Sequence, residues 1–444
     1  MKLLANWGYE MGPKGSFDRV LKLLKEHHKW SQETVNLIAS ENVPSPAVRE
    51  ALVSDFGNRY AEGAPGKRLY AGCKYIDEVE FLAIDLAKEV FGAAHANVQP
   101  VSGVVANLAT YTAFTQPGDT LMSLSITCGG HISMGKKKFG GTAGSVHGLD
   151  VEYFPFDEEA MNIDVERARE KIKEVSPDLV LFGASVFPFP HPVKELSDVA
   201  SDCGARIAYD AAHVAGLIGG GHFQNPLEEG AEVMNCSTHK TLPGPQHGMI
   251  LTAEEDLKEI IDRSVFPGVV SNHHLHSVAA LAISLAENLE FGEEYGSQII
   301  KNAKSLGEAL YNRGVDVLAS EKGFTSSHVI LADVTDHGLG GEFERKLEDA
   351  NVIVNRNLLP WDVREGRHYD NPGGIRLGVS EVTRLGMEEE DMERIADFIG
   401  RVVIEDENPE IVRKDVEKFA RDYSKVNYCF ESETEAYEYI NIHS

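Results

Sequence analysis

The sequence predicts an α/β protein with a mostly parallel β-sheet covered by helices on both faces, followed by a smaller C-terminal α/β domain. Strand-like and helix-like segments alternate from about Ser40 to Glu290, as in successive βαβ units. Several strand-like segments are continuously apolar, which is typical of strands buried on both faces. The chain has 444 residues, 42% hydrophobic and 25% charged, which is long enough for two or more domains.

The first half of the chain supplies the expected large domain. Residues 15–35 predict a polar amphipathic helix, which we expect to be an arm over a partner subunit, and residues 77–91 place apolar side chains at helical spacing. Short apolar segments are predicted to be strands at 120–123, 179–182, 206–209, 233–236 and 248–251. Asp210 and Lys240 follow two of these strands. Because ligands bind beyond the carboxyl ends of strands in open α/β sheets, both residues are placed where such a site would be.

The second half predicts a smaller unit. A helix over residues 275–291 leads out of the large domain, and a separate helix over 297–313 begins the small one. Strands are expected near 315–318, 328–332 and 352–354, then a helix over 388–403 and a charged, aromatic tail that packs as a helix. The expected units are an N-terminal arm at 1–35, a large domain at 36–290, a small domain at 291–404 and a tail at 405–444.

Composition excludes several classes of function. The formal net charge of −28 disfavours nucleic acids and anionic membranes, because both would repel the chain. No run of about 18 apolar residues predicts a membrane span, and the first residues lack the apolar core of a signal peptide. The five cysteines show no Cys-x-x-Cys pair, which favours a reducing cytoplasm over disulfides or structural zinc.

Lys240 and Asp210 suggest a site for pyridoxal 5′-phosphate (PLP). Lys240 lies in Cys-Ser-Thr-His-Lys-Thr-Leu-Pro-Gly-Pro-Gln at 236–246, and Asp210 in Tyr-Asp-Ala-Ala-His at 209–213. A lysine with a lowered pKa forms a Schiff base with an aldehyde, and a carboxylate facing the pyridine nitrogen keeps that ring protonated. The alternative is a solvated surface lysine and an aspartate that caps a strand end.

Further motifs carry candidate ligands, each with an ordinary structural alternative. Ser102 and Gly103 open an apolar helix, where free amides suit a phosphate, although a plain helix cap has the same pattern. His131 follows two glycines and is placed to stack on a pyridine ring or simply to pack in a loop.

Two more residues have the chemistry of substrate-binding groups. Glu62 lies in a loop at 60–73 that is dense in Gly, Pro and Tyr, where it is either an acid/base group or a turn residue in water. Arg376 lies between apolar neighbours, so its planar guanidinium holds either a substrate carboxylate or a local Asp or Glu. His273, His274 and His276 lack the spacing of a helical zinc site, so we expect loop packing and no metal.

In order along the chain, these motifs resemble the serine hydroxymethyltransferase family. The resemblance covers roughly residues 30–400 and includes features of the archaeal branch: Gly-Pro-Gln at 244–246, His-Pro-Val-Lys at 191–194 and Glu-Val-Thr-Arg-Leu-Gly-Met at 381–387. The matching segments are 36–42, 60–80, 95–100, 102–103, 129–131, 209–216, 238–241 and 374–378.

The resemblance implies a PLP-dependent transferase of fold type I, similar to aspartate aminotransferase, with a seven-stranded sheet. It implies a homodimer or a dimer of dimers with sites at the subunit interface. The implied reaction is reversible transfer of the serine hydroxymethyl carbon to a reduced pterin, tetrahydrofolate or tetrahydromethanopterin, giving glycine. A threonine aldolase or transaldolase on the same scaffold is the alternative, and a non-catalytic scaffold is a second one. Glu62, Tyr70 and Asn357 favour the pterin enzyme, whereas a scaffold needs neither Lys240 nor Arg376.

The resemblance also implies individual roles. Lys240 is the Schiff-base lysine, Asp210 pairs with the pyridine nitrogen, and His131 stacks on the ring. The remaining cofactor contacts are Ser102, Gly103 and His239 at the phosphate, Tyr60 reaching it from the other subunit, and Ser185 and His213 near the phenolic oxygen. The substrate contacts are Arg376 and Ser40 at the carboxylate, Glu62 as acid/base, Tyr70 beside the reacting carbon and Asn357 at the pterin.

The chain departs from the family pattern in three places. Val104 and Val105 replace the Ser-Gln of a Ser-Gly-Ser-Gln motif, which removes one phosphate hydroxyl. Ser271 and Asn272 stand where the family has a Gly-Gly pair that the second subunit places near the phosphate. An arginine of the bacterial branch is replaced within Pro-Gln-His-Gly at 245–248.

Overall fold

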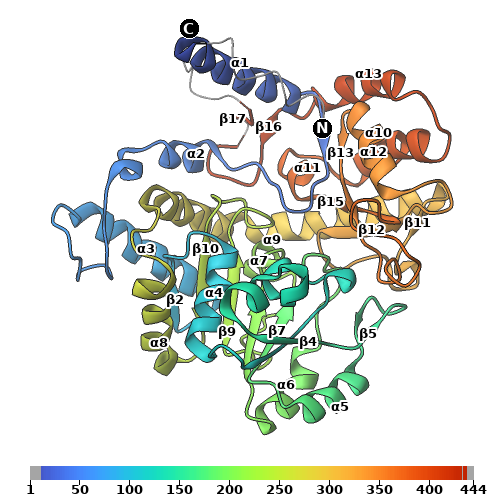
Figure 1. Ribbon diagram of the computed structural model, residues 1–444. Coiled ribbons are helices and arrows are strands. Elements are labelled where there is room, and N and C mark those ends of the chain that lie inside the picture. The colour runs from blue at the N-terminus through green and yellow to red at the C-terminus, as the bar shows by residue number, and fades with distance from the viewer. Residues whose placement is uncertain (1–11, 433, 438–444) are drawn as a thin grey trace.

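The computed structural model describes residues 12–432 and 434–437, and its two largest sheets are separated by one long helix, α9 (Leu275–Asn312) (Figure 1). The seven-stranded sheet lies on one side of α9 and a four-stranded sheet on the other. The first residues of the expected arm, 1–11, and the last of the tail, 438–444, lie outside the described residues.

The seven-stranded sheet is mixed, with six strands in one direction and β10 in the other. β10 pairs antiparallel with β2 and β9, whereas the remaining pairs are parallel. In spatial order the strands are β2 (His95–Asn97), β10 (Gly248–Thr252), β9 (Val233–Ser237), β8 (Arg206–Asp210), β7 (Leu179–Gly183), β3 (Thr120–Ser123) and β4 (Asp150–Tyr153). All five predicted strands of this sheet are therefore present.

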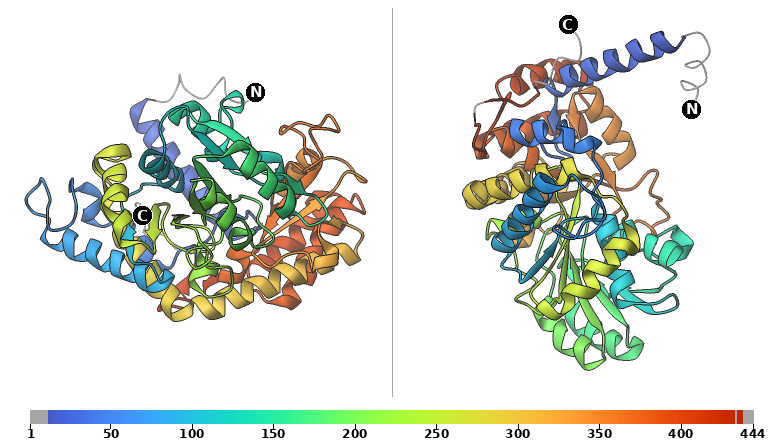
Figure 2. Two further views of the ribbon diagram at one scale, coloured as in Figure 1. Left: turned by 90° about the horizontal axis from the view of Figure 1, so that it is seen from below. Right: turned by 90° about the vertical axis from the view of Figure 1, so that its left-hand side faces the viewer.

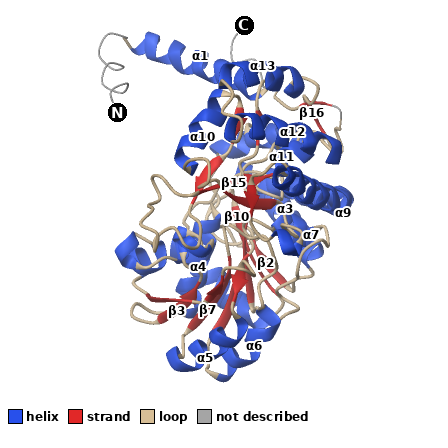
Figure 3. Cartoon of the chain, turned by 90° about the vertical axis from the view of Figure 1, so that its right-hand side faces the viewer, coloured by secondary structure: helices blue, strands red, loops and turns tan. Residues whose placement is uncertain are grey.

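Helices cover both faces of this sheet (Figure 3). α4 (Gly103–Phe114) packs on β8, β9 and β10, and α3 (Lys74–Phe91) contacts β2 and β10 from the opposite face. Every residue of β7, β9 and β10 is buried, as expected of strands covered by helices on both faces. The other helices of this region are α2 (Pro46–Leu52), α5 (Val165–Val175), α6 (Val193–Asp202), α7 (Ala215–Gly219) and α8 (Lys258–Arg263).

The prediction of two helices over 275–291 and 297–313 was wrong, because α9 continues through residues 292–296. Gly292 and Gly296 lie in the stretch between the two expected helices, and both are buried and serve close packing. A Cβ on Gly296 would lie 3.0 Å from His222 Cδ2, and one on Gly220 would lie 2.2 Å from the carbonyl oxygen of Gly292. The helix therefore runs through the boundary expected at residue 290.

The second sheet is antiparallel and lies beyond α9. Its order is β11 (Asp316–Val317), β12 (Val329–Asp333), β15 (Gly374–Gly378) and β14 (Asn355–Asn357). Three helices belong to this part of the chain. The helix expected at 388–403 is α12 (Glu389–Val403), whereas α10 (Gly340–Asp349) and α11 (Ser380–Arg384) were not predicted.

β13 (Val352–Ile353) does not join this second sheet. It pairs in parallel with β1 (Val35–Asn36), and this pairing brings the N-terminal segment to the carboxyl half of the chain. Ala39 packs against Gly378 at the end of β15, so the segment that carries Ser40 lies beside the strand that carries Arg376.

The ends of the chain extend the fold. The tail contains the predicted helix, α13 (Pro409–Ala420), and then the short strands β16 (Lys425–Val426) and β17 (Thr434–Glu435), which pair with each other. α1 (Pro13–Ser31) has no buried residue and projects from the body of the molecule (Figure 2). None of the helices in the described part of the chain has the length and apolarity that a membrane span requires.

Candidate active site

A cavity of about 200 Å³ lies at the carboxyl ends of β7, β8 and β9 and at the N-terminus of α4. Its position is the one expected for a ligand site in an open α/β sheet. Eight of the predicted site residues line it: Ser102, Gly103, His131, Ser185, Asp210, His213, His239 and Lys240.

Lys240 follows β9 and has only 8% of its surface exposed. The pKa of its amine is lowered to about 8. Burial is the main cause; the charge of Asp210 opposes the shift, and the charge of Arg376 adds to it. Its backbone carbonyl accepts a hydrogen bond from Asn42 Nδ2 at 2.6 Å. The residue is thus fixed in place, and more of its amine is neutral near pH 7 than in a lysine exposed to water.

Asp210 ends β8 and its two carboxylate oxygens are held separately. Oδ2 accepts from Asn107 Nδ2 at 2.8 Å, and Oδ1 accepts from the backbone amide of Ala212 at 3.0 Å. Asn107 belongs to α4, and its own Oδ1 accepts from Asn235 Nδ2 at 2.9 Å. We did not predict Asn107, although a buried polar residue in an otherwise apolar helix was a usable signal.

His131 is oriented by Ser133. The backbone amide of Ser133 donates to His131 Nδ1 at 3.1 Å, so the neutral ring carries its proton on Nε2. Burial lowers the pKa of His131, and the charges of Lys240 and Arg376 add to this against the opposing charge of Asp210. The ring is therefore a neutral, flat wall of the cavity.

A second histidine, His328, supports His213 and was not predicted. His328 Nε2 lies 3.1 Å from the carbonyl oxygen of Ala39 and 3.2 Å from His213 Nδ1. The carbonyl requires Nε2 of His328 to be the donor, so Nδ1 of His213 accepts and its Nε2 carries the proton. Burial lowers the pKa of His328 to about 3. Its signal in the sequence was only a lone histidine before a strand.

The end of the cavity at α4 has the groups that an anion needs. Ser102 is the N-cap of the helix, and its hydroxyl accepts from the amide of Val105 at 3.3 Å. A Cβ on Gly103 would lie 2.3 Å from Ser237 Oγ, so only glycine leaves room there. His239 Nδ1 is buried without a hydrogen-bond partner among the described residues. Free amides at a helix N-terminus and an unpartnered ring nitrogen fit the phosphate of PLP.

Arg376 lies beside the cavity and has no carboxylate partner among the described residues. Its Nε donates to Asn355 Oδ1 and its Nη1 donates to the carbonyl of Ser185, each at 3.0 Å. Burial lowers the pKa of its guanidinium to about 10, so the group stays charged at neutral pH. Within residues 12–432 and 434–437 no Asp or Glu forms an ion pair with it, which disfavours the structural ion pair as its role.

The remaining predicted residues do not line this cavity. Tyr60 and Tyr70 are each 46% exposed, with ring centroids 4.9 Å apart, and Tyr60 OH donates to Glu62 Oε1 at 3.4 Å. Ser40 follows Ala39 on the segment beside β15, and Asn357 lies on β14, where its amide donates to the carbonyl of Leu358 at 2.8 Å. The Glu62 loop thus does not line the Lys240 cavity of its own chain.

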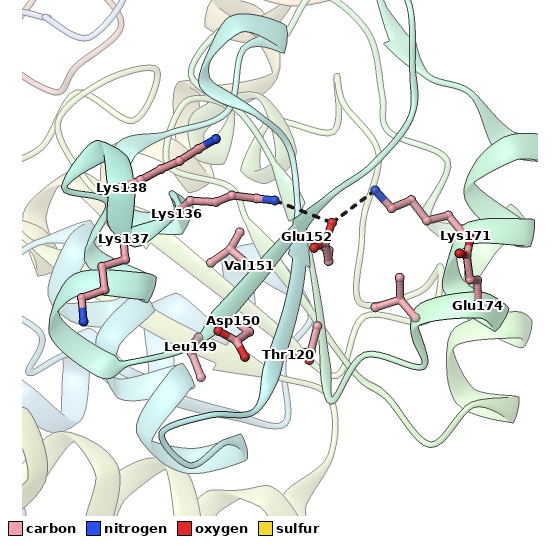
Figure 4. Close-up of a pocket in the computed structure, with 11 residues that line it drawn as sticks. Thr120, Lys136, Lys137, Lys138, Leu149, Asp150, Val151, Glu152, Lys171 and Glu174 are labelled. Atoms are coloured by element: carbon pink, nitrogen blue, oxygen red, sulfur yellow. Dashed lines mark ion pairs between the residues drawn. The ribbon is translucent and has the colours of Figure 1, made fainter.

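A larger hollow of about 970 Å³ lies elsewhere, at the amino ends of β3 and β4 (Figure 4). Lys136 and Lys171 approach Glu152 from either side, at 3.7 and 3.4 Å. This is the opposite end of the strands from Asp210, and its lysines neutralise a surface carboxylate. It is therefore not part of the candidate site.

Comparison with known proteins agrees with this geometry. The family model for serine hydroxymethyltransferase matches residues 15–399. Proteins named serine hydroxymethyltransferase from the archaea Nitrosopumilus maritimus and Korarchaeum cryptofilum are 54% and 55% identical over 97% of this chain, and cover 98% and 100% of their own lengths. The protein of that name from Methanocaldococcus jannaschii is 55% identical over 94% of this chain and 96% of its own length. The chain belongs to the serine hydroxymethyltransferase family, whose members are PLP-dependent one-carbon transferases that use a reduced pterin as cosubstrate.

Proposed function

We propose that this chain transfers the hydroxymethyl carbon of serine reversibly to a reduced pterin, giving glycine, in the cavity around Lys240. The observation that carries this proposal is the combination of a buried lysine of lowered pKa, a fixed aspartate and an arginine that has no carboxylate partner in the described part of the chain. When bound, PLP supplies an electron sink for the carbanion that forms at the serine α-carbon.

The cavity residues would hold PLP by complementary chemistry. Lys240 provides the amine that attaches the aldehyde, Asp210 faces the pyridine nitrogen and His131 covers the ring. Ser102, Gly103 and His239 bind the phosphate at the N-terminus of α4. Ser185 and His213 contact the phenolic oxygen, where the proton on His213 Nε2 supplies a donor. The polar groups that support these roles all face one cavity.

The substrate would be held by residues beside the cavity. Arg376 binds the serine carboxylate through its planar guanidinium, and Ser40 adds a hydroxyl from the segment next to β15. Glu62 exchanges a proton at the serine hydroxyl, Tyr70 lies beside the reacting carbon, and Asn357 contacts the pterin. Either tetrahydrofolate or tetrahydromethanopterin meets these requirements.

We further propose that the site is completed by a second copy of the chain, in a dimer or a dimer of dimers. Tyr60, Glu62 and Tyr70 lie outside the cavity of their own chain, so they would serve the partner's cavity, with Tyr60 at the phosphate. The arm would cover the partner, because α1 buries none of its residues in one chain. Its exposed apolar side chains are Phe17, Val20, Leu23 and Leu24. The proposed units are the arm at 1–35, the large PLP-binding domain at 36–290, the small domain at 291–404 and the tail at 405–444.

A single assay tests the reaction. Serine turnover by the PLP-loaded protein is measured without pterin, with tetrahydrofolate and with tetrahydromethanopterin. We expect glycine formation that depends on one of the two pterins. Cleavage of a bulky 3-hydroxy amino acid, measured on the same preparation, is the control for PLP loading. Active cleavage without any pterin-dependent serine turnover would contradict the proposal and leave an aldolase.

A further inference from the structure

Three consecutive residues, Ser271 to His273, hold the loop that carries Glu62. They precede α9 in the chain, whereas the loop lies about two hundred positions earlier, before α3. Each of the three makes a different contact with the loop or with the side chains that support it. Ser271 and Asn272 are also the two positions where a glycine pair was expected, and glycines have no side chain with which to make such contacts.

Ser271 contacts the functional group of Glu62 itself. Its hydroxyl donates to Glu62 Oε1 at 2.5 Å, and the hydroxyl of Tyr60 donates to the same oxygen at 3.4 Å. In the described part of the chain, no hydrogen bond reaches the second oxygen, Oε2. One carboxylate oxygen is therefore anchored, and the other is left available to a substrate.

Asn272 and Arg68 fix the backbone on both sides of Glu62. Asn272 Oδ1 accepts from the amide of Ala61 at 2.9 Å. Arg68 Nη1 donates to the carbonyls of Ala61 and Gly63. The residues before and after Glu62 are thus held at three polar groups, so the backbone of Glu62 has little freedom to move.

His273 closes the arrangement through a buried ion network. Its Nε2 lies 2.8 Å from Glu80 Oε2, and Glu80 also pairs with Arg68. Burial alone would raise the pKa of Glu80. The hydrogen bond and charge of His273 and the charge of Arg68 outweigh burial, so the pKa lies below its usual value. A charged Glu80 orients Arg68, and Arg68 in turn holds the carbonyls beside Glu62. Residues 271–273 therefore hold the loop in two ways: Ser271 and Asn272 contact it directly, and His273 supports it through the buried Glu80 and Arg68.

We infer that Ser271 and Asn272 are positioning residues that aim one carboxylate oxygen of Glu62 at the serine hydroxyl. The inference rests on the proposed function, in which Glu62 moves that proton. A glutamate side chain with three rotatable bonds is a poor acid/base group until its carboxylate is placed within hydrogen-bond reach of the proton it moves. The Ser271 hydroxyl supplies that placement, and Asn272 supplies the fixed backbone beneath it.

The test compares four chains loaded with PLP: wild type, Ser271→Ala, Ser271→Thr and Ser145→Ala. Ser145 is an exposed serine far from the loop in sequence, and serves as the matched control. We expect kcat for serine-to-pterin transfer to fall about 10-fold in Ser271→Ala, because a hydrogen bond to a charged group is lost. KM for serine, PLP affinity and thermal midpoint should stay unchanged. Ser271→Thr keeps the hydroxyl and should retain most of the rate, as should Ser145→Ala.

A double-mutant cycle with Glu62→Gln gives the sharpest readout. Adding Ser271→Ala to Glu62→Gln should cost nothing further, because the serine acts only through the carboxylate. A full additional 10-fold loss of kcat in the double variant would overturn the inference. A loss of PLP affinity in Ser271→Ala would also overturn it, because Ser271 would then be a ligand of the phosphate bound in the partner's cavity. If Glu62→Gln alone leaves transfer intact, the proposed role of Glu62 fails first and the inference falls with it.

For Asn272, the variant Asn272→Ala removes the acceptor of the Ala61 amide. It should lower kcat for transfer while the cleavage of 3-hydroxy amino acids and the binding of PLP persist. An equal loss of both reactions would assign Asn272 to the fold and overturn its part of the inference.

Discussion

The cavity around Lys240 and the loop around Glu62 are both held rigidly, but they differ in what they face. Asp210, Lys240 and Arg376 are enclosed by strands and helices of their own chain, and burial lowers the pKa of both cationic groups. The loop is anchored by the buried network of Arg68, Glu80 and His273, yet its tyrosines are exposed. An anchored loop with exposed tyrosines is what the proposed site, shared between two chains, requires.

The comparison also separates the chemistry. The cavity around Lys240 has fixed charges and little solvent access, which suit it to lower the pKa of a lysine and to orient a cofactor. The loop around Glu62 has a carboxylate with one anchored oxygen, which suits a group that exchanges protons with a substrate. Changes in the cavity should therefore affect every reaction of the protein, whereas changes in the loop should affect only those that need the proton transfer.

The largest effect is expected from Lys240→Ala. The variant lacks the amine that we propose attaches PLP, so serine turnover and the visible absorption of the bound cofactor should both disappear. Lys136→Ala, in the hollow of Figure 4, is the matched control and should keep both. Serine turnover that persists in Lys240→Ala would show that another lysine holds the cofactor.

Glu62→Gln should separate the contribution of the loop around Glu62 from that of the cavity around Lys240. Proton transfer by a placed acid/base group typically contributes about 100- to 10,000-fold in rate, so serine-to-pterin transfer should fall by that amount. Cleavage of a bulky 3-hydroxy amino acid and PLP binding should survive at least in part, because the cavity is unchanged. Both reactions are measured on one preparation, and an equal loss of the two would mean that the loop serves a shared step.

Arg376→Ala should abolish amino-acid binding but leave PLP in place. Removing one partner of a buried, charged pair costs about 2 to 5 kcal/mol, which is a loss of affinity of at least about 30-fold. Arg376→Lys keeps a charge without the planar fork and should recover only part of the affinity. Serine and glycine titrations followed by the cofactor spectrum check this. Unchanged affinities would make Arg376 a structural residue.

The smallest effect is a pH dependence of PLP capture by the cofactor-free chain. Only the neutral amine of Lys240 attacks the aldehyde, and its pKa of about 8 is below the ordinary lysine value of 10.5. The capture rate should rise with pH and level off above about pH 8. Because the charge of Asp210 raises this pKa, Asp210→Asn should move the midpoint to lower pH. A capture rate whose pH midpoint lies near the pKa of a solvent-exposed lysine would contradict the burial of Lys240 in the cavity.

Sequence reasoning predicted the parts of the fold that depend on local patterns. The strands that end at Asp210 and near Lys240 were found because apolar segments end in polar residues. The parallel pairing of β1 with β13 was missed, since two-residue strands leave no periodic signal. The break expected within α9 was wrong because its glycines serve packing contacts with distant segments.

The candidate site shows the same division. Lys240, Asp210 and Gly103 lie in recognisable motifs, and the structure brings them to one cavity. His328 contacts His213 from 115 positions away, and Asn107 reaches Asp210 from 103 positions away. Tertiary packing defines both contacts. The sequence marked Asn107 only as a polar residue in an apolar helix, and neither residue belongs to a motif that names its partner.

The most direct test of a shared site mixes two inactive chains. Lys240→Ala lacks a working cavity and Glu62→Gln lacks a working loop, so each alone should be inactive in serine-to-pterin transfer. If each cavity uses the partner's loop, unfolding and refolding a 1:1 mixture produces mixed dimers in which one of the two sites is intact. Random pairing then predicts recovery of about one quarter of the wild-type activity. A mixture as inactive as its two components would show that Lys240 and Glu62 act within a single chain, and would contradict the account.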